Sequence, residues 1–356
     1  MTQIFSVLLF SLMQMLGVGE RVEIVFAGDA MQHSPQIAAA LRDDGTYDYS
    51  QCFELIEDDI RGADFAVVNL EVPLGGKPYS GYPVFSAPDD YARQLKASGF
   101  DLLITANNHC LDRGSKGLLR TLAVLDSIDM ASIGTYVSQE RRDEIVPYIV
   151  NVKGCKIAML AYTYGTNGFK AINGVVDMID RAIIKKDISE ARENGAQVVC
   201  VNLHWGTEYM RLPDKAQRSL TDFLVDEGVD LIIGGHPHVV QPMEMRYSYR
   251  HEKDVLVVYS LGNFISNQND IDGRGGAMVK AELILNDGEV AGIRAGYKLL
   301  FCQKPKKGVA GDNYRLIPGS CRDSVRADSQ ATFDEFMERT RSLLTTHNSD
   351  DIKELK

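Results

Sequence analysis

Histidines and carboxylates stand directly after several short apolar runs of this sequence. The chain has 356 residues but only seven histidines, and four of the seven follow such runs. Imidazoles, carboxylates and an amide together form a ligand set that suits zinc, manganese or ferrous iron without any sulfur. We therefore expect a metal site. The predicted ligands are Asp29, Glu71, Asn108, His204, His236 and His238.

The segment Gly234-Gly235-His236-Pro237-His238 is the most specific single motif. The glycines allow a tight turn of the backbone, and the proline stiffens the spacing between the two imidazoles. A lone histidine after a strand is more often structural than a ligand. The metal hypothesis therefore depends on several such positions occurring together.

Each of these polar groups follows a run that is typical of a strand buried on both faces. In layered α/β folds, sites form beyond the carboxyl ends of the strands, where loops bring distant residues together. Helical patterns lie between the runs, and two of them stop at a glycine. The predicted strands are 22–27, 65–70, 102–105, 156–161, 198–203, 231–233 and 255–259, and the predicted helices are 115–127, 183–194 and 214–227.

The alternation of strands and helices predicts an α/β layered fold. After residue 275 the pattern changes, because 277–285 and 290–300 indicate consecutive strands with no helix between them. A helix at 332–344 follows. No Pro/Ser-rich linker divides the chain, so we expect one domain over residues 21–345 and a polar C-terminal tail over 346–356.

Composition limits the class of protein. An apolar content of 45% is typical of a soluble globular chain with an ordinary core. The net charge of −11 argues against nucleic acid as a partner, because such binding needs a basic face. None of the six cysteines forms a C-x-x-C pair, so a cysteine zinc site is not expected. Cys302 and Cys321 could pair in an oxidising compartment, but the sequence does not fix connectivity.

Residues 1–20 form an apolar N-terminal segment, uncharged from Ile4 to Gly19. The segment is too short for a typical spanning helix and is typical of a secretory signal peptide. It lacks a preceding Lys or Arg and an A-x-A site. We expect export to the periplasm or cell envelope, with association to the membrane through this segment as a further option. The alternative is a cytoplasmic protein in which the segment stays packed.

Six motifs, read together, resemble a known family. They are G-D-A-M, N-L-E, N-N-H, H-W-G, G-G-H-P-H, and Y-S-L-G-N-F at 259–264. In this order they resemble the bacterial capsule-synthesis CapA proteins, which are associated with poly-γ-glutamate and look like a branch of the calcineurin-like metallophosphoesterases. The resemblance covers residues 22–264. It implies a four-layer α/β/β/α double β-sandwich and a site for two divalent metals, of which manganese, zinc and iron are the candidates.

The resemblance also implies roles for single residues. Asp29 and His238 would bind a first metal, Asn108, His204 and His236 a second, and Glu71 would bridge the two. His109 would be the catalytic acid that protonates the leaving group. Asp112, three residues further on, is a candidate for orienting that imidazole.

The first motif departs from the superfamily pattern. Related phosphoesterases usually carry D-x-H, whereas this chain has Met31 at the third position and its nearest imidazole at His33. The first metal site is therefore predicted to lack a ligand. It would be weaker, empty, or completed by His33 or by water.

Further polar residues follow the same motifs. Arg113, Arg211 and Arg274 could each hold a carboxylate or phosphate in a bidentate grip, or be solvated loop arginines. Tyr164 and Asn263 stand at strand ends and are candidates for substrate binding. Trp205, beside His204, would either wall the site or pack in the core.

The sequence therefore favours a metal-dependent hydrolase of the cell envelope, acting through a metal-bound hydroxide on a phosphoester or a γ-glutamyl amide. Its substrate would be a small or polymeric anion, and poly-γ-glutamate is one candidate. Two alternatives stay open. One is a non-catalytic component of capsule or polymer assembly that works by binding, and the other is a nucleotide phosphodiesterase. The oligomeric state is not predicted.

Overall fold

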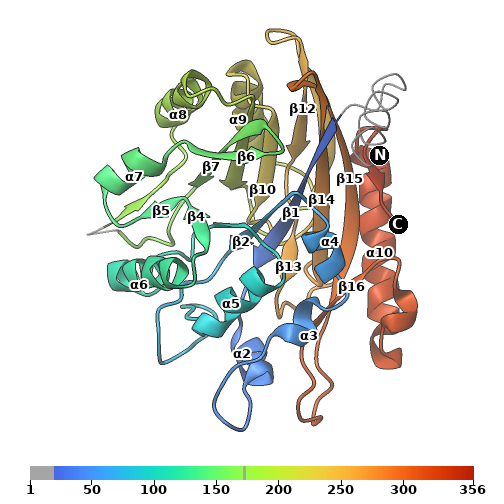
Figure 1. Cartoon of the computed structure of the whole chain (residues 1–356). Coiled ribbons are helices and arrows are strands. Elements are labelled where there is room, and N and C mark those ends of the chain that lie inside the picture. The colour runs from blue at the N-terminus through green and yellow to red at the C-terminus, as the bar shows by residue number, and fades with distance from the viewer. Residues whose placement is uncertain (1–19, 171–173) are drawn as a thin grey trace, which may run out of the picture.

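The computed structural model describes residues 20–170 and 174–356 (Figure 1). The predicted N-terminal apolar segment therefore lies outside the described residues, apart from Glu20. Within the described ranges, no helix combines the length and the apolar character needed to cross a bilayer.

Two β-sheets stacked face to face form the centre of the molecule. The described part of the larger sheet has nine strands in the order β16-β15-β14-β1-β2-β3-β4, with β13 paired to β1 and β17 paired to β15. The strands are β1 Glu20–Ala30, β2 Phe65–Leu70, β3 Leu102–Ile104, β4 Ala131–Ile133, β13 Asn263–Ile265, β14 Gly275–Asn286, β15 Glu289–Gln303, β16 Arg315–Pro318 and β17 Lys353–Glu354.

The described part of the smaller sheet has six strands in the order β11-β12-β10-β9-β7-β6. A separate pair, β5 with β8, lies outside both sheets. These strands are β5 Thr135–Tyr136, β6 Tyr148–Val152, β7 Cys155–Thr163, β8 Val175–Val176, β9 Val198–His204, β10 Leu231–Gly235, β11 Met243–Ser248 and β12 Lys253–Val258.

Parallel pairing at the centre of each sheet sets the position of the site. Strands β1, β2, β3 and β4 pair in parallel, and so do β7, β9, β10 and β12. Antiparallel strands stand at the outer positions, such as β6 and β11. Because parallel strands end at the same edge of a sheet, residues that follow them along the chain are brought together there.

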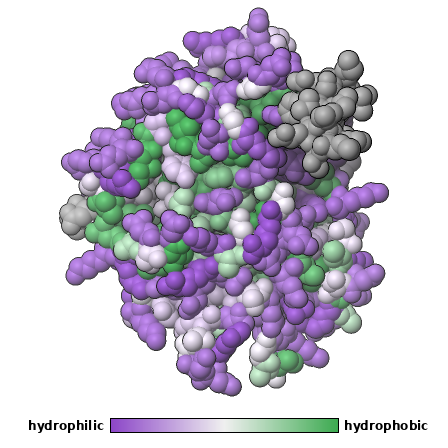
Figure 2. Space-filling view, in the orientation of Figure 1, coloured by the Kyte–Doolittle hydropathy of each residue, from purple (hydrophilic) through white to green (hydrophobic). Residues whose placement is uncertain are grey.

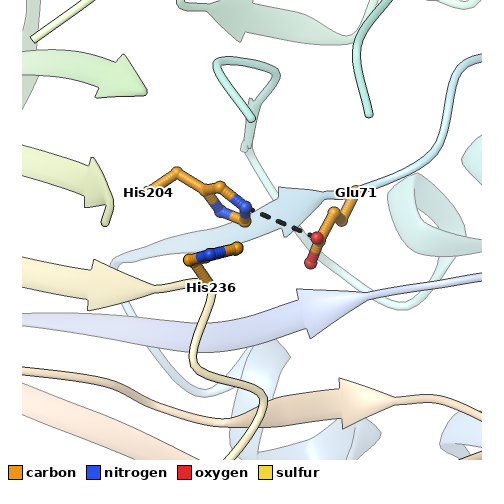
Figure 3. Close-up of side chains that lie close together, drawn as sticks. All are labelled: Glu71, His204 and His236. Carbon is orange, nitrogen blue, oxygen red and sulfur yellow. Dashed lines mark ion pairs between the residues drawn. The ribbon is translucent and has the colours of Figure 1, made fainter. Parts of the chain in front are cut away.

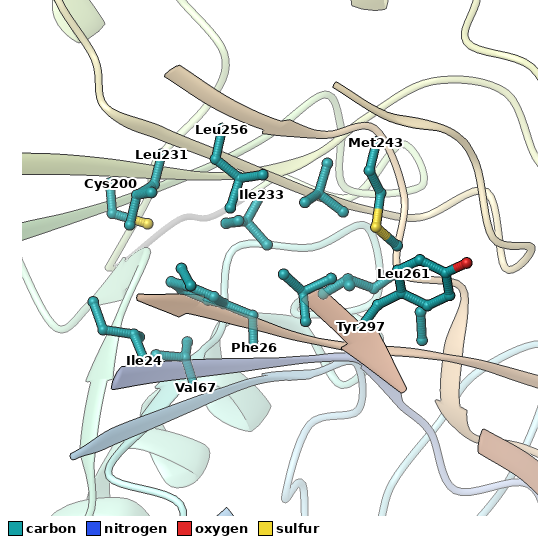
Figure 4. Close-up of a cluster of buried hydrophobic side chains, with 14 of the residues drawn as sticks. Ile24, Phe26, Val67, Cys200, Leu231, Ile233, Met243, Leu256, Leu261 and Tyr297 are labelled. Atoms are coloured by element: carbon teal, nitrogen blue, oxygen red, sulfur yellow. The ribbon is translucent and has the colours of Figure 1, made fainter. Parts of the chain in front are cut away.

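The main core fills the space between the two sheets (Figure 4). Ile24 and Phe26 of β1 point toward the smaller sheet, whereas the intervening Val25 belongs to the cluster on the opposite face. This alternation follows from the two-residue period of a strand. Leu231 and Ile233 of β10 enter the same core from the smaller sheet. Each such buried side chain contributes about 1.5–3 kcal/mol through removal of apolar surface from water.

Helices cover both outer faces. A second apolar cluster joins the larger sheet to α3, α4, α5 and α6, and a third joins the smaller sheet to α8 and α9. Asp180 caps α8 and Asp214 caps α9, where its side chain accepts from the backbone N–H of Gln217. The helices are α2 Ser34–Ala40, α3 Ser50–Phe53, α4 Glu57–Arg61, α5 Asp89–Ala97, α6 Gly114–Ser127, α7 Gln139–Ile145, α8 Arg181–Glu193, α9 Lys215–Asp226 and α10 Gln330–His347.

The predicted α/β/β/α double β-sandwich is thus confirmed. The strands that the sequence did not reveal are mainly short or at an edge, such as β4, β6 and β11, where polar residues interrupt the apolar pattern. The segment 346–356, expected as a polar tail, is partly packed. Ile352 is buried in the main core, and β17 pairs in parallel with β15.

The surface is mostly polar. Figure 2 shows a largely hydrophilic face on which hydrophobic side chains gather in the left half, on the side of α6 and α7.

Candidate metal centre

The six predicted ligands all meet at the carboxyl ends of the parallel strands. Asp29 lies at the end of β1, Glu71 directly after β2, and Asn108 after β3. His204 is the last residue of β9, and the other two histidines follow β10. Each of the six is no more than 3% exposed. The larger sheet supplies the carboxylates and the amide, and the smaller sheet supplies the imidazoles.

The ligand atoms form two overlapping groups. Asp29, Glu71 and His238 make one, and Glu71, His204 and His236 make the other. Within each group the ligand atoms lie within 4.8 Å of one another, and Glu71 belongs to both. Figure 3 shows Glu71 facing the two imidazoles of the second group, with His204 Nε2 3.4 Å from Glu71 Oε1. Asn108 Oδ1 lies 2.8 Å from the same His204 Nε2 and brings an amide oxygen to this group.

Glu71 carries the clearest sign that a cation belongs here. Its side chain is fully buried, and within the described chain neither carboxylate oxygen has a hydrogen-bond partner. Burial raises the pKa of Glu71 to about 8, and the charge of Asp29 adds to this rise. A buried carboxylate without a partner costs free energy, which a bound cation would offset. The donor set therefore fits a divalent metal.

Asp29, in contrast, is firmly held. Asn69 Nδ2 donates to its Oδ1 at 2.8 Å, and the backbone N–H of His236 donates to its Oδ2 at 3.1 Å. His238 Nδ1 lies 3.3 Å from the same Oδ2. Burial opposes ionisation of Asp29, but the contacts with His238 and Asn69 and the charge of His204 keep its pKa well below the usual range.

The three imidazoles differ in protonation. Burial lowers the pKa of His204 to about 3 and that of His236 to about 2, so both rings are neutral at neutral pH. A neutral ring presents the lone pair that binds a metal. Burial also opposes the charge of His238, but Glu71 and Asp29 raise its pKa to about 9. A metal ion would compete with that proton.

The two glycines of the G-G-H-P-H motif act through close packing. A Cβ on Gly235 would lie 2.6 Å from Asp29 Oδ1, and one on Gly234 would lie 2.1 Å from the carbonyl oxygen of Tyr259. The left-handed backbone conformation falls instead on His236, with φ of 95°, and on His238, with φ of 59°. Such conformations cost of order 1–3 kcal/mol each and cluster at functional sites. The expectation that the glycines make the tight turn is therefore wrong.

Met31 and His33 contribute to neither ligand group. Met31 is buried in the apolar cluster beneath the larger sheet. His33 Nδ1 lies 3.1 Å from Gln36 Oε1 and accepts from the backbone N–H of Asn267 at 3.3 Å. The His33 ring packs edge-on against Phe85, with centroids 5.3 Å apart.

His109 and Asp112 form a buried pair. Asp112 Oδ2 lies 2.8 Å from His109 Nδ1 and also accepts from the backbone N–H of Phe85 at 2.7 Å. The Phe85 ring packs edge-on against the imidazole, at 4.7 Å between centroids. Burial opposes the charge of His109, but the hydrogen bond with Asp112 and the charge of Glu71 raise its pKa above the ordinary value.

Two of the four residues predicted to bind substrate lie beside the ligand groups. The Tyr164 ring is 4.4 Å from that of His236 and 46% exposed. Asn263 is buried, and its Oδ1 lies 3.1 Å from His238 Nδ1. The other two have different contacts. Arg113 donates to the carbonyl of Pro78, and Arg274 donates to the carbonyl of Cys302 and lies over the Phe301 ring.

Four further candidate residues from the sequence lie away from the two ligand groups or form no bond with each other. Arg211 donates to the carbonyl of Arg339 and lies 3.7 Å from Asp272. Trp205 packs in the core of the smaller sheet, stacked on Tyr259. Cys302 and Cys321 are both free thiols, so the option that they pair is not realised.

Sequence reasoning missed Asn69. Its Nδ2 donates to Asp29 and lies 3.3 Å from His204 Nδ1, so one amide holds a carboxylate and an imidazole from different sheets. The signal was present, because Asn69 and Glu71 are two residues apart at a strand end and so point to one face. Sequence reasoning also missed Glu208, whose carboxylate lies in one cluster with His236 and His238.

A double β-sandwich with buried carboxylates and imidazoles at its strand ends has a metallophosphoesterase-like fold. The chain belongs to the family described as bacterial capsule synthesis protein PGA_cap, whose model matches residues 23–268. The family predicted from the six motifs is thereby confirmed.

Curated relatives agree with this family. The chain is 29% identical to the capsule biosynthesis protein CapA of Bacillus anthracis, over 74% of this chain and 64% of that one. It is 31% identical to the PGA biosynthesis protein CapA of Bacillus subtilis, over 66% of this chain and 61% of that one. The chain thus spans less than two thirds of either relative.

A solved structure shares the fold. The NAD nucleotidase of Haemophilus influenzae superposes with a TM-score of 0.50 at 12% identity, over 95% of this chain and 64% of that one.

Proposed function

We propose that this protein is a metal-dependent hydrolase of the cell envelope that acts in the biosynthesis of a poly-γ-glutamate capsule. The family match and the names of the two CapA relatives support the biological setting. The substrate is a small or polymeric anion that offers a phosphoester or a γ-glutamyl amide for cleavage. Export through residues 1–20 belongs to the same proposal.

In this proposal the centre would hold two divalent metal ions, with manganese, zinc and iron as the candidates. Asp29, Glu71 and His238 would hold one, and Glu71, His204, His236 and Asn108 would hold the other. When bound, such ions act as Lewis acids and activate water at neutral pH. The buried Glu71 carboxylate, which has no hydrogen-bond partner, is the observation that carries this assignment.

His109 and Asp112 handle the proton in this proposal. Asp112 accepts the hydrogen bond from His109 Nδ1, and this leaves Nε2 to donate to the leaving group. The raised pKa of His109 increases the protonated fraction at neutral pH. The Phe85 backbone N–H, which also donates to Asp112, fixes the carboxylate that orients the ring.

A non-catalytic binding component of capsule assembly is the second candidate. One observation favours it: Met31 packs in the core, so that the first group has three ligands where the second, with Asn108, has four. A weakly held first metal would limit the activation of water.

Metal content separates these candidates. We would measure bound metals by mass spectrometry in the wild type, in His236→Ala, and in the control His251→Ala, whose ring contacts the carbonyl of Asp226. About two ions per chain, lost only in His236→Ala, would support the hydrolase and lead to a screen of phosphoesters and γ-glutamyl amides. About one ion would favour the binding component. No bound metal after reconstitution with manganese or zinc would refute the centre.

A further inference from the structure

Glu208 lies on a loop that is fastened to the His236-Pro237-His238 segment. The loop follows β9, and the backbone N–H of Tyr209 donates to the carbonyl of Pro237 at 2.8 Å. Gln241 Nε2 donates a hydrogen bond of 2.7 Å to the backbone carbonyl of Met210, the residue after Tyr209. The backbone on which Glu208 stands is therefore fixed relative to the two imidazoles.

The Glu208 carboxylate lies near one histidine from each of the two metal groups. A carboxylate oxygen of Glu208 and one ring nitrogen each of His236 and His238 lie within 4.8 Å of one another. His236 is also in the group with His204, and His238 is also in the group with Asp29. Glu208 is exposed, whereas the two histidines are buried. Its carboxylate therefore approaches the centre from the solvent side.

The ligand count leaves room for one more donor. Zinc takes four ligands and manganese up to six, whereas Asp29, Glu71 and His238 supply three. Buried His236 Nδ1 also has no hydrogen-bond partner within the described chain. A carboxylate that lies near both His236 and His238 is placed to offer a further donor to the centre.

We propose that Glu208 is an additional metal ligand, supplied from the solvent side of the centre. This inference rests on the metal centre proposed above. Because the carboxylate is exposed, its charge stays hydrated in the metal-free protein, and little desolvation cost is incurred before a metal binds. A ligand on the solvent side would be one that a substrate oxygen could replace, because substrate would reach the centre from solvent.

The test is calorimetric titration of the full-length, metal-free protein with Mn²⁺ and with Zn²⁺. We expect Glu208→Gln to weaken the affinity of at least one site by roughly 10–100-fold, the range seen when groups that support a metal are removed. The melting temperature of the metal-free variant should stay that of the wild type, because the residue is exposed. With Co²⁺ bound, the visible absorption spectrum should change as a ligand is lost.

Asp270→Asn is the matched control. Asp270 is an exposed carboxylate close enough to act electrostatically on Tyr209, so this variant removes the same charge from the same region. If Asp270→Asn weakens binding as much as Glu208→Gln, Glu208 acts only through its charge, and the ligand assignment is overturned. Equal metal affinity and an equal Co²⁺ spectrum in wild type and Glu208→Gln would overturn it too. A wild type that binds no metal would instead overturn the metal centre itself.

Discussion

Two buried clusters of ionisable groups occupy different parts of the molecule. They differ in whether all of their charged groups have hydrogen-bond partners. In one, the guanidinium of Arg142 on α7 donates to Asp177 and, at 2.5 Å, to Asp187 on α8. The hydroxyl of Tyr162 donates to Asp187 as well, at 2.8 Å. In the other, the metal centre, Glu71 is buried with no hydrogen-bond partner in the described chain.

This difference separates a structural cluster from a functional one. In the Arg142 cluster, each charged group has a partner among the side chains of the cluster itself. In the Glu71 cluster, both oxygens of Glu71 and the Nδ1 atom of His236 have no hydrogen-bond partner within the described residues. Buried polar groups are normally hydrogen-bonded, so these unpaired ligand atoms support the proposed metal site. Substitutions in the two clusters should therefore change the free energy of unfolding in opposite directions.

Removing Arg142 should have the largest effect on stability. Arg142→Met leaves Asp177 and Asp187 buried without their cation, and breaking one partner of a buried ion pair costs about 3–5 kcal/mol. Urea unfolding of the metal-free protein measures the loss. The neighbouring Arg141→Met is the control, because its exposed pair with Glu144 contributes about 1 kcal/mol or less. Equal losses in both variants would contradict the structural role of the cluster.

The Arg142 cluster should also make stability depend on pH. Burial raises the pKa of Asp177 to about 6 in spite of Arg142, above the ordinary value of about 3.9 for an aspartate. The folded protein then holds the proton more tightly than the unfolded chain, so this contribution is full below about pH 4 and is lost as the pH rises to about 6. At about 1.4 kcal/mol for each pKa unit, the loss is at most about 3 kcal/mol.

Asp177→Asn removes this titration. Unfolding free energies of the wild type and the variant, measured from pH 4 to pH 7, should therefore differ by an amount that moves in favour of the variant as the pH rises. A difference that stays constant across this range would show that Asp177 titrates normally.

In the metal centre, Asp112→Asn should reduce the rate and leave the fold intact. The variant loses the carboxylate that orients His109, and general acid catalysis is typically worth 10²–10⁴-fold. We expect a fall of about 100-fold in kcat on whichever substrate the screen identifies, with unchanged metal content. A loss of bound metal in this variant would mean that Asp112 supports the ligands rather than the proton donor.

The smallest effect expected is that of Glu71→Gln on the metal-free protein, and its sign is opposite to that of Arg142→Met. Removing a buried carboxylate that accepts no hydrogen bond from the described residues should leave the free energy of unfolding unchanged or raise it by about 1 kcal/mol. The rise in melting temperature on adding Mn²⁺ should disappear. Destabilisation comparable to that of Arg142→Met would refute the contrast between the clusters.

The sequence predicted those parts of the fold and site that depend on local pattern. Apolar runs such as 198–203 revealed the central strands, and the polar residues after them identified the six groups that converge. Edge strands such as β11 were not predicted, because half-exposed residues interrupt their apolar pattern. The packing of the segment after α10 was not predicted, because it depends on one buried residue, Ile352.

Side-chain direction is what the sequence could not supply. Arg113 and Arg274 follow the right motifs, yet their guanidinium groups are held by backbone carbonyls and an aromatic ring. Asn69 and Glu208 reach the centre through contacts between the two sheets or between two loops. Such contacts depend on tertiary packing rather than on spacing along the chain.

The division of ligands between the sheets has a mechanical consequence. Asp29, Glu71 and Asn108 come from the larger sheet and the three histidines from the smaller one, so a metal bound as proposed would cross-link the two halves of the sandwich. Its affinity then measures how well the sheets are aligned. A substitution deep in the core, such as Val67→Ala or Ile233→Val, replaces none of the proposed ligands. Either substitution would still raise the dissociation constant for the metal if it lets one sheet slide over the other.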